Sequence, residues 1–165
     1  MRLKVIQKVL GLLLSIFSVA LLPPLLIAQW TRDGAGNAFA IAIVVILFAG
    51  LALWAPVRNV KREMKLRDGF IIVVLFWVIL GTSGSIPFML VEGLEMSPPD
   101  AIFESLSGLT TTGATVIVGI DALPPSILFY RQLLQWLGGM GIIVLAVAIL
   151  PILGVGGMQL YRAET

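Results

Sequence analysis

Residues 97–115 read SPPDAIFESLSGLTTTGAT, and this stretch decides the fold of the chain. It lies between two long apolar segments, yet its own centre is too polar to cross a bilayer. Ser97 can cap a helix, Pro98 suits the first helical position, and Asp100 completes a capping box of the form S-x-x-D. An apolar stripe at helical spacing follows, made of Ile102, Leu106 and Leu109. The stretch therefore predicts a helix over about 98–109, roughly 18 Å long and half a membrane thick.

The segment after this helix, TTTGAT at 110–115, is the most informative part of the chain. Gly108 and the three threonines are expected to end the helix, since glycine and β-branched residues form helices poorly. A half-length helix followed by a polar Thr/Gly segment between two full spans is the layout of a re-entrant pore loop. Non-helical backbone at membrane depth persists only where it is packed in protein or lines a wet cavity. The alternative is a Thr/Gly turn between helices without an ion role.

The composition is that of an integral membrane protein. Of 165 residues, 59% are hydrophobic and 12% charged, and the mean hydropathy is +1.05; soluble domains carry about 25% charged residues. Cysteine and histidine are absent, which removes disulfides, thiol chemistry and the usual haem and transition-metal ligands. The nine acidic residues form no cluster in the sequence. We expect no enzyme activity, no bound cofactor and no nucleic-acid partner.

Four apolar segments are expected to cross the membrane, at residues 9–28, 38–54, 69–90 and 126–150. A signal peptide is the alternative for the first of them. Pro23 and Pro24 should bend or end its outer part, and Ser126 can cap the last. The predicted divisions are two leading transmembrane helices (1–56), a basic cytoplasmic loop (57–68), a span–pore loop–span repeat (69–151) and a cytoplasmic tail (152–165). The fold class is all-α integral membrane: two leading helices plus one helix–re-entrant pore loop–helix unit.

The distribution of charge predicts the orientation in the membrane. Eight of the eleven basic residues lie before residue 9 or within 57–68, whereas 92–125 holds five acids and neither lysine nor arginine. By the positive-inside rule, both termini are cytoplasmic and the pore loop opens outward.

The chemistry expected of residues 110–115 is cation coordination by backbone oxygens. Potassium filters are rings of carbonyls that replace the hydration shell of the ion, with four loops to a pore. The predicted filter residues are Thr111, Thr112, Gly113, Ala114 and Thr115, with potassium held by the carbonyls of the first three. Gly113 permits dihedral angles that other residues resist. A cation would also be favoured at the C-terminus of the half-length helix, and the acidic outer loop would concentrate cations at the mouth.

The sequences SLSGLTTTGATVIVG and YRQLLQWLGGMGIIVLAVAILP resemble the Trk-type bacterial potassium uptake proteins of the Trk/Ktr/HKT superfamily, along the whole chain. That resemblance implies a multi-pass protein of the bacterial inner membrane with four span–pore–span repeats about a pseudo-fourfold axis. It also implies a homodimer and a cytosolic nucleotide-binding regulatory ring (TrkA-like). The first filter segment of the family falls on residues 111–115, and its filter glycine on Gly113.

This chain supplies one repeat where the family has four, so we expect an N-terminal portion of a longer protein whose tail is truncated. Potassium uptake is the expected function, with this chain as one quarter of the pore. Two alternatives remain: a non-conducting membrane fragment with at most an assembly role, and a small cation channel of four identical chains.

Several other residues receive structural interpretations. Gly138, Gly139 and Gly141 are expected to allow close helix packing rather than to form a hinge. Arg131 should snorkel or pair with an outer acid, and Glu104 should pair within the protein rather than meet the ion. The basic loop determines topology and can also contact anionic lipid.

Overall fold

The structure is a computed structural model, and it describes residues 3–60, 66–94 and 96–149. Within these ranges every regular element is a helix, as the sequence predicts. Residues 61–65 of the expected basic loop and the expected tail at 152–165 lie outside the described residues. Three helical stretches in the described part are long and apolar enough to span a membrane, namely Leu3–Thr31, Gly36–Val57 and Gly69–Leu90.

The first expected span consists of two helices, α1 (Leu3–Ala20) and α2 (Leu22–Thr31). The chain breaks at Leu21, two residues before the first of the prolines at 23 and 24. Proline lacks an amide hydrogen and its ring collides with the carbonyl of the preceding turn, so a break at this point is its ordinary effect. The predicted bend is confirmed.

The second and third expected spans also correspond to helices. The helix α3 (Gly36–Trp54) continues into the short 3₁₀ helix η1 (Ala55–Val57), and α4 (Leu66–Ser83) is followed by α5 (Ile86–Leu90). The interruption between α4 and α5 leaves the carbonyl of Gly84 outside a helix, and the buried hydroxyl of Tyr130 donates to it at 2.7 Å. The last long helix is α7 (Pro125–Ile149), with 25 residues.

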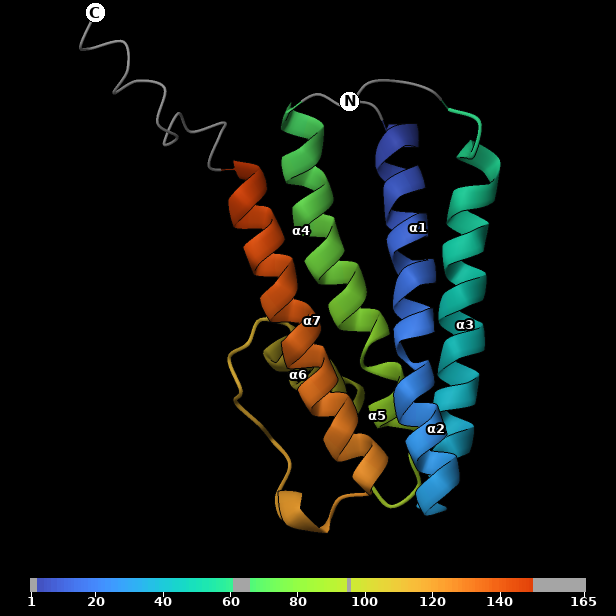
Figure 1. Ribbon diagram of the computed structural model, residues 1–165, viewed down its shortest axis with the longest axis vertical. Helices are drawn as coiled ribbons and strands as arrows, with labels where there is room; N and C mark the ends of the chain where they lie inside the picture. Colours follow the sequence, from blue (N-terminus) through green and yellow to red (C-terminus); the bar gives the residue numbers. More distant parts are fainter. Residues whose placement is uncertain (1–2, 61–65, 95, 150–165) are drawn as a thin grey trace, which may run out of the picture.

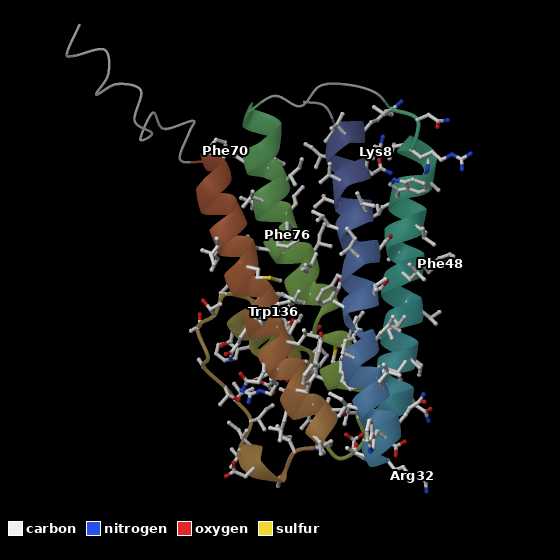
Figure 2. The ribbon with its side chains drawn as sticks, viewed as in Figure 1. Lys8, Arg32, Phe48, Phe70, Phe76 and Trp136 are labelled. Atoms are coloured by element: carbon white, nitrogen blue, oxygen red, sulfur yellow. The ribbon has the colours of Figure 1, made fainter. Side chains whose placement is uncertain are left out.

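Figure 1 shows α1, α3, α4 and α7 as a bundle of roughly aligned helices, in which α1 and α4 run in one direction and α3 and α7 in the opposite direction. The start of α1, the end of α3, the start of α4 and the end of α7 lie at one end of the bundle. The α2–α3 turn and the 3₁₀ helix η2 (Ile120–Ala122) lie at the opposite end. Figure 2 accordingly places Lys8 and Arg32 at opposite ends of the molecule.

Two glycines allow α1 and α3 to approach closely. A β-carbon at Gly11 would lie 2.7 Å from the backbone nitrogen of Trp54, and one at Gly50 would lie 2.8 Å from that of Ser15. Small residues at helix interfaces are the usual device for close packing in lipid, where lipid tails are as apolar as the side chains. The two leading spans therefore form a tight pair.

The core joins the leading helices to the last one through aromatic contacts. The ring of Tyr130, which is fully buried, lies 5.4 Å from that of Phe39 and 5.2 Å from that of Phe88. Side chains on the outside of the bundle are apolar and exposed; Phe48 points away from the helices in Figure 2. An apolar exterior of this kind is suited to lipid.

Candidate ion-coordination site

The short helix α6 (Pro98–Leu109) occupies the range expected for the pore helix. The hydroxyl of Ser97 accepts from the backbone amide of Asp100 at 3.4 Å and donates to its carboxylate at 2.6 Å. Ser97 is the N-cap, as its position in the sequence predicts. The carboxylate of Asp100 also lies in the first turn, where the positive end of the helix dipole favours it.

The buried face of α6 differs from the predicted apolar stripe. Ile102 and Leu106 are only partly buried, whereas Ala101, Ser105 and Gly108 are buried. A β-carbon at Gly108 would lie 3.1 Å from the β-carbon of Leu134 on α7. Small residues on the buried face let α6 lie close to its neighbours, and Leu109 of the predicted stripe is buried with them.

Helix α6 ends in a Schellman motif rather than at Gly108, which lies inside the helix. The amide of Thr112 donates to the carbonyl of Ser107 at 3.0 Å, and that of Thr111 to Gly108 at 2.9 Å. Such a motif requires a left-handed residue, usually glycine, and here Thr111 adopts it with φ of 57°. The helix ends at the predicted position, and the threonines end it as expected, but through the left-handed conformation of Thr111 rather than through low helix propensity alone.

The segment after Thr111 is exposed and non-helical through Thr115. In Figure 1 it leaves α6 near the middle of the bundle and descends to η2 at the lower end. Gly113 has a φ of 73°, which confirms the prediction that this position needs glycine-like dihedral angles. The carbonyls of Thr111, Thr112 and Gly113 receive no hydrogen bond from the described part of the chain.

Ala114 and Thr115 differ from the three residues before them, because both are tied to α6. The hydroxyl of Ser107 donates to the carbonyl of Ala114 at 2.6 Å. The hydroxyl of Thr115 donates to the carboxylate of Glu104 at 2.9 Å. Thr111, Thr112 and Gly113 thus present three successive free carbonyls. Ala114 is held by the helix through its carbonyl and Thr115 through its hydroxyl.

Glu104 joins three segments of the chain at one buried carboxylate. Its Oε1 atom accepts from Nε of Arg131 on α7 at 2.6 Å. Its Oε2 atom accepts from the backbone amide of Val116 at 3.3 Å, in addition to the bond from Thr115. Glu104 is 3% exposed and Arg131 8% exposed. The prediction that Glu104 pairs within the protein and that Arg131 pairs with an acid is confirmed.

The three glycines on α7 behave differently from one another. A β-carbon at Gly138 would overlap the carbonyl of Leu109 at the end of α6. At Gly139 the nearest atom would be the methyl group of Thr111 at 3.8 Å, and at Gly141 a ring atom of Phe76 at 3.9 Å, both ordinary contacts. The packing role predicted for all three is confirmed for Gly138, which fixes how closely α7 crosses the C-terminal end of α6.

Sequence reasoning missed Ser107 as a determinant of the site, and it named Thr111 as a filter residue without its left-handed conformation. Ser107 contributes its carbonyl to the Schellman motif and its hydroxyl to Ala114. The available signal was its position three residues after Glu104, which puts both polar side chains on one side of a helix in an apolar setting. For Thr111 there was no signal, because its left-handed conformation is imposed by the surroundings.

The fold and the site together define a class: an all-helical membrane protein in which a half-length helix and a returning segment lie between two long helices. Comparison with known proteins gives the family. The family model described as "TrkH: Cation transport protein" matches residues 35–165, so the chain belongs to the TrkH family.

Individual relatives agree with this assignment. The chain is 61% identical over 164 residues to the Trk system potassium uptake protein TrkH of Vibrio parahaemolyticus and 59% identical to that of Escherichia coli K12. It is 38% identical over 161 residues to the TrkG protein of Escherichia coli K12. The first two comparisons cover 99% of this chain and 34% of the relative, so the chain spans about a third of their length.

A solved structure supports the fold. The crystal structure of the potassium transporter TrkH from Vibrio parahaemolyticus superposes with a TM-score of 0.89 at 58% identity, covering 99% of this chain and 35% of that one. The relatives are named for transport rather than catalysis, and the predicted class of non-enzymatic membrane protein is confirmed.

Proposed function

We propose that this chain supplies one quarter of the selectivity filter of a potassium uptake transporter. The ligands are the backbone carbonyls of Thr111, Thr112 and Gly113, within a filter segment that runs to Thr115. One observation carries the proposal: three successive carbonyls in an exposed, non-helical segment have no donor in the described part of the chain. Backbone of this kind inside a membrane needs water, an ion or further protein to satisfy it.

Potassium chemistry suits these groups. Carbonyl oxygens from four loops can replace the hydration shell of the ion, and one loop supplies a quarter of each ring. The negative end of α6 contributes less than the sequence suggests, since the carbonyls of Leu106, Ser107 and Gly108 already accept bonds from the residues that follow the helix. The free carbonyls are therefore the principal ligands.

The backbone at Thr111 supports a specialised role. A β-branched residue with φ of 57° is strained, and such conformations persist where the surroundings over-determine them, often at ligand sites. Glycine would adopt the same conformation without that strain. The methyl group of Thr111 faces Gly139, so the side chain helps to place the segment against α7.

Acidic residues near the returning segment can concentrate cations. Glu92, Asp100 and Asp121 are exposed, and Asp100 borders a hollow of about 350 Å³ beside residues 116–119. Glu104 makes no contribution to this acidic mouth because it is buried and paired. A mouth of one charge sign raises the local concentration of the opposite ion.

The wider setting follows from the same proposal. Both termini are cytoplasmic, the acidic end of the bundle faces outward, and the protein resides in the bacterial inner membrane. The full-length protein is a homodimer that binds a TrkA-like nucleotide-binding ring. A homotetramer of this chain alone is the competing arrangement, and a non-conducting fragment is the other.

A chimera tests the proposal. The 165 residues replace the matching segment of the Vibrio parahaemolyticus relative, and the product is expressed in a bacterium that lacks its own potassium uptake systems. The chimera should restore growth at low external potassium and carry potassium in preference to sodium in liposomes. The 165 residues alone, with a quarter of each ring, should do neither. Selective flux from a cross-linkable tetramer of the short chain would support the homotetramer instead.

A further inference from the structure

Both oxygens of the Glu104 carboxylate are occupied by neighbouring groups. One accepts from Arg131 at 2.6 Å and from the hydroxyl of Thr115 at 3.1 Å; the other accepts from Thr115 at 2.9 Å and from the amide of Val116 at 3.3 Å. The side chain is almost entirely buried. A carboxylate whose oxygens are already committed in this way does not serve as a ligand for a passing ion.

The three donors to Glu104 come from two different parts of the chain. Arg131 belongs to α7, whereas Thr115 and Val116 follow the free carbonyls at 111–113 after the single residue Ala114. Ser107, one turn further along α6, holds the carbonyl of Ala114 at 2.6 Å. The outer end of the segment is thus fixed at two successive points on α6, and its inner end is fixed by the Schellman motif.

We propose that Glu104 is a positioning residue that sets the spacing of the free carbonyls by anchoring the outer end of their segment. Arg131 balances the charge of Glu104, so that the carboxylate does not act as an off-path cation site. This inference rests on the proposed function. Coordination sites hold their geometry only when the surrounding shell is fixed.

Substitutions at Glu104 and Arg131, made singly and together, test whether the two charges act as a pair. Glu104→Gln keeps an oxygen acceptor near Thr115 but leaves the guanidinium unpaired. Arg131→Met keeps the carboxylate but leaves a buried anion beside the conduction path. Removing one partner of a buried pair is far more damaging than removing both. The double variant should therefore be closer to the unmutated chimera than either single variant.

The experiment measures the potassium-to-sodium flux ratio in liposomes that contain equal amounts of folded chimera, together with the melting temperature. Each single variant should lower the ratio roughly tenfold, the scale of one charged hydrogen bond. The double variant should recover much of that loss. Tyr130→Phe is the matched control, since it removes another buried hydrogen bond of α7, to Gly84, that does not touch the segment. It should lower the melting temperature and leave the ratio unchanged.

Thr115→Val provides a second test that does not depend on the folding of the charge variants. It removes the hydroxyl that donates to Glu104 and keeps the ion pair and the side-chain shape. The flux ratio should again fall. Unchanged flux ratios in Glu104→Gln and Thr115→Val would overturn the inference. It would also be overturned if Tyr130→Phe lowered the flux ratio as much as these variants do for the same fall in melting temperature. An unmutated chimera without selective flux would instead contradict the proposed function.

Discussion

The carboxylate of Asp33 accepts a hydrogen bond of 3.0 Å from the backbone amide of Ser126, which lies 93 positions further along the chain. The other oxygen of Asp33 accepts from the amide of Ala35 at 3.0 Å. The turn between α2 and α3 thereby caps the start of α7. The prediction that Ser126 caps this helix was wrong: its hydroxyl is buried without a partner in the described part of the chain. A cap from a distant segment cannot be recognised in local sequence.

Replacing Asp33 with alanine should destabilise the outer end of α7. The substitution leaves two amides without their acceptor, and loss of a helix cap costs about 1 kcal/mol. Thermal melting of the chimera in detergent checks this, and the melting temperature should fall. Asp121→Ala, at an exposed aspartate in η2, is the control and should have little effect. Equal effects of the two substitutions would show that the Asp33 cap contributes nothing.

The cap should also depend on pH. Partial burial alone raises the pKa of Asp33, but hydrogen bonds from Ser126 and Ala35 outweigh it and hold the pKa below its usual range. A folded-state pKa below the unfolded value stabilises the protein above about pH 4, and the contribution is lost as the pH falls through the folded pKa. The melting temperature of Asp33→Asn should therefore fall less between pH 7 and pH 3 than that of the unmutated chimera, because the variant has no carboxylate to protonate at this position. An equal fall in melting temperature for the variant and the unmutated chimera would contradict the prediction.

Alanine at two adjacent glycines of α7 should have very different effects. A methyl group at Gly138 would overlap the carbonyl of Leu109, so α6 and α7 must separate, at a cost of about 1–3 kcal/mol. A methyl group at Gly139 would make an ordinary contact with Thr111. The yield of folded chimera by size-exclusion chromatography should drop for Gly138→Ala only. Comparable yields for both variants would mean that the helices are not packed this closely.

Serine at Gly113 should weaken the preference for potassium over sodium. Among the described residues no atom lies within 4 Å of the added β-carbon, so the effect arises from the backbone, whose φ of 73° costs other residues about 1–2 kcal/mol. Relaxation of that strain would redirect the adjoining carbonyls. Gly34→Ser is a matched control with φ of 85° and an equally open position in the α2–α3 turn. Flux ratios in liposomes should change for Gly113→Ser and stay unchanged for Gly34→Ser and Gly139→Ala. Unchanged selectivity in Gly113→Ser would remove this segment from the filter.

Single cysteines should report the orientation of the bundle. Asp121→Cys and Asn59→Cys place thiols at exposed positions in η2 and just after η1, which lie at opposite ends of the bundle in Figure 1. This chain contains no cysteine of its own, and a cysteine-free version of the chimera is the background. An impermeant thiol reagent added to intact cells should label Asp121→Cys only. Labelling of Asn59→Cys alone would reverse the topology.

The sequence by itself determined the properties that depend on neighbours along the chain. Hydropathy located the spans, because apolar length is what lipid requires of a helix. Prolines marked the break after α1, and Ser97 with Asp100 marked the start of α6. The half-length of α6 and the position of Gly113 indicated the candidate site. The resemblance of its motif indicated the family that the comparisons then established.

Only the tertiary structure decided which groups meet. Glu104 and Arg131 are 27 positions apart, and Asp33 and Ser126 are 93 apart, so no local pattern could show that they bond. The left-handed conformation of Thr111 contradicts the intrinsic preference of threonine, and the overlap that forbids a side chain at Gly138 comes from another helix. The physical reason is that spans arise from interactions between the chain and lipid, whereas the geometry of the site arises from contacts that exist only after the helices have packed.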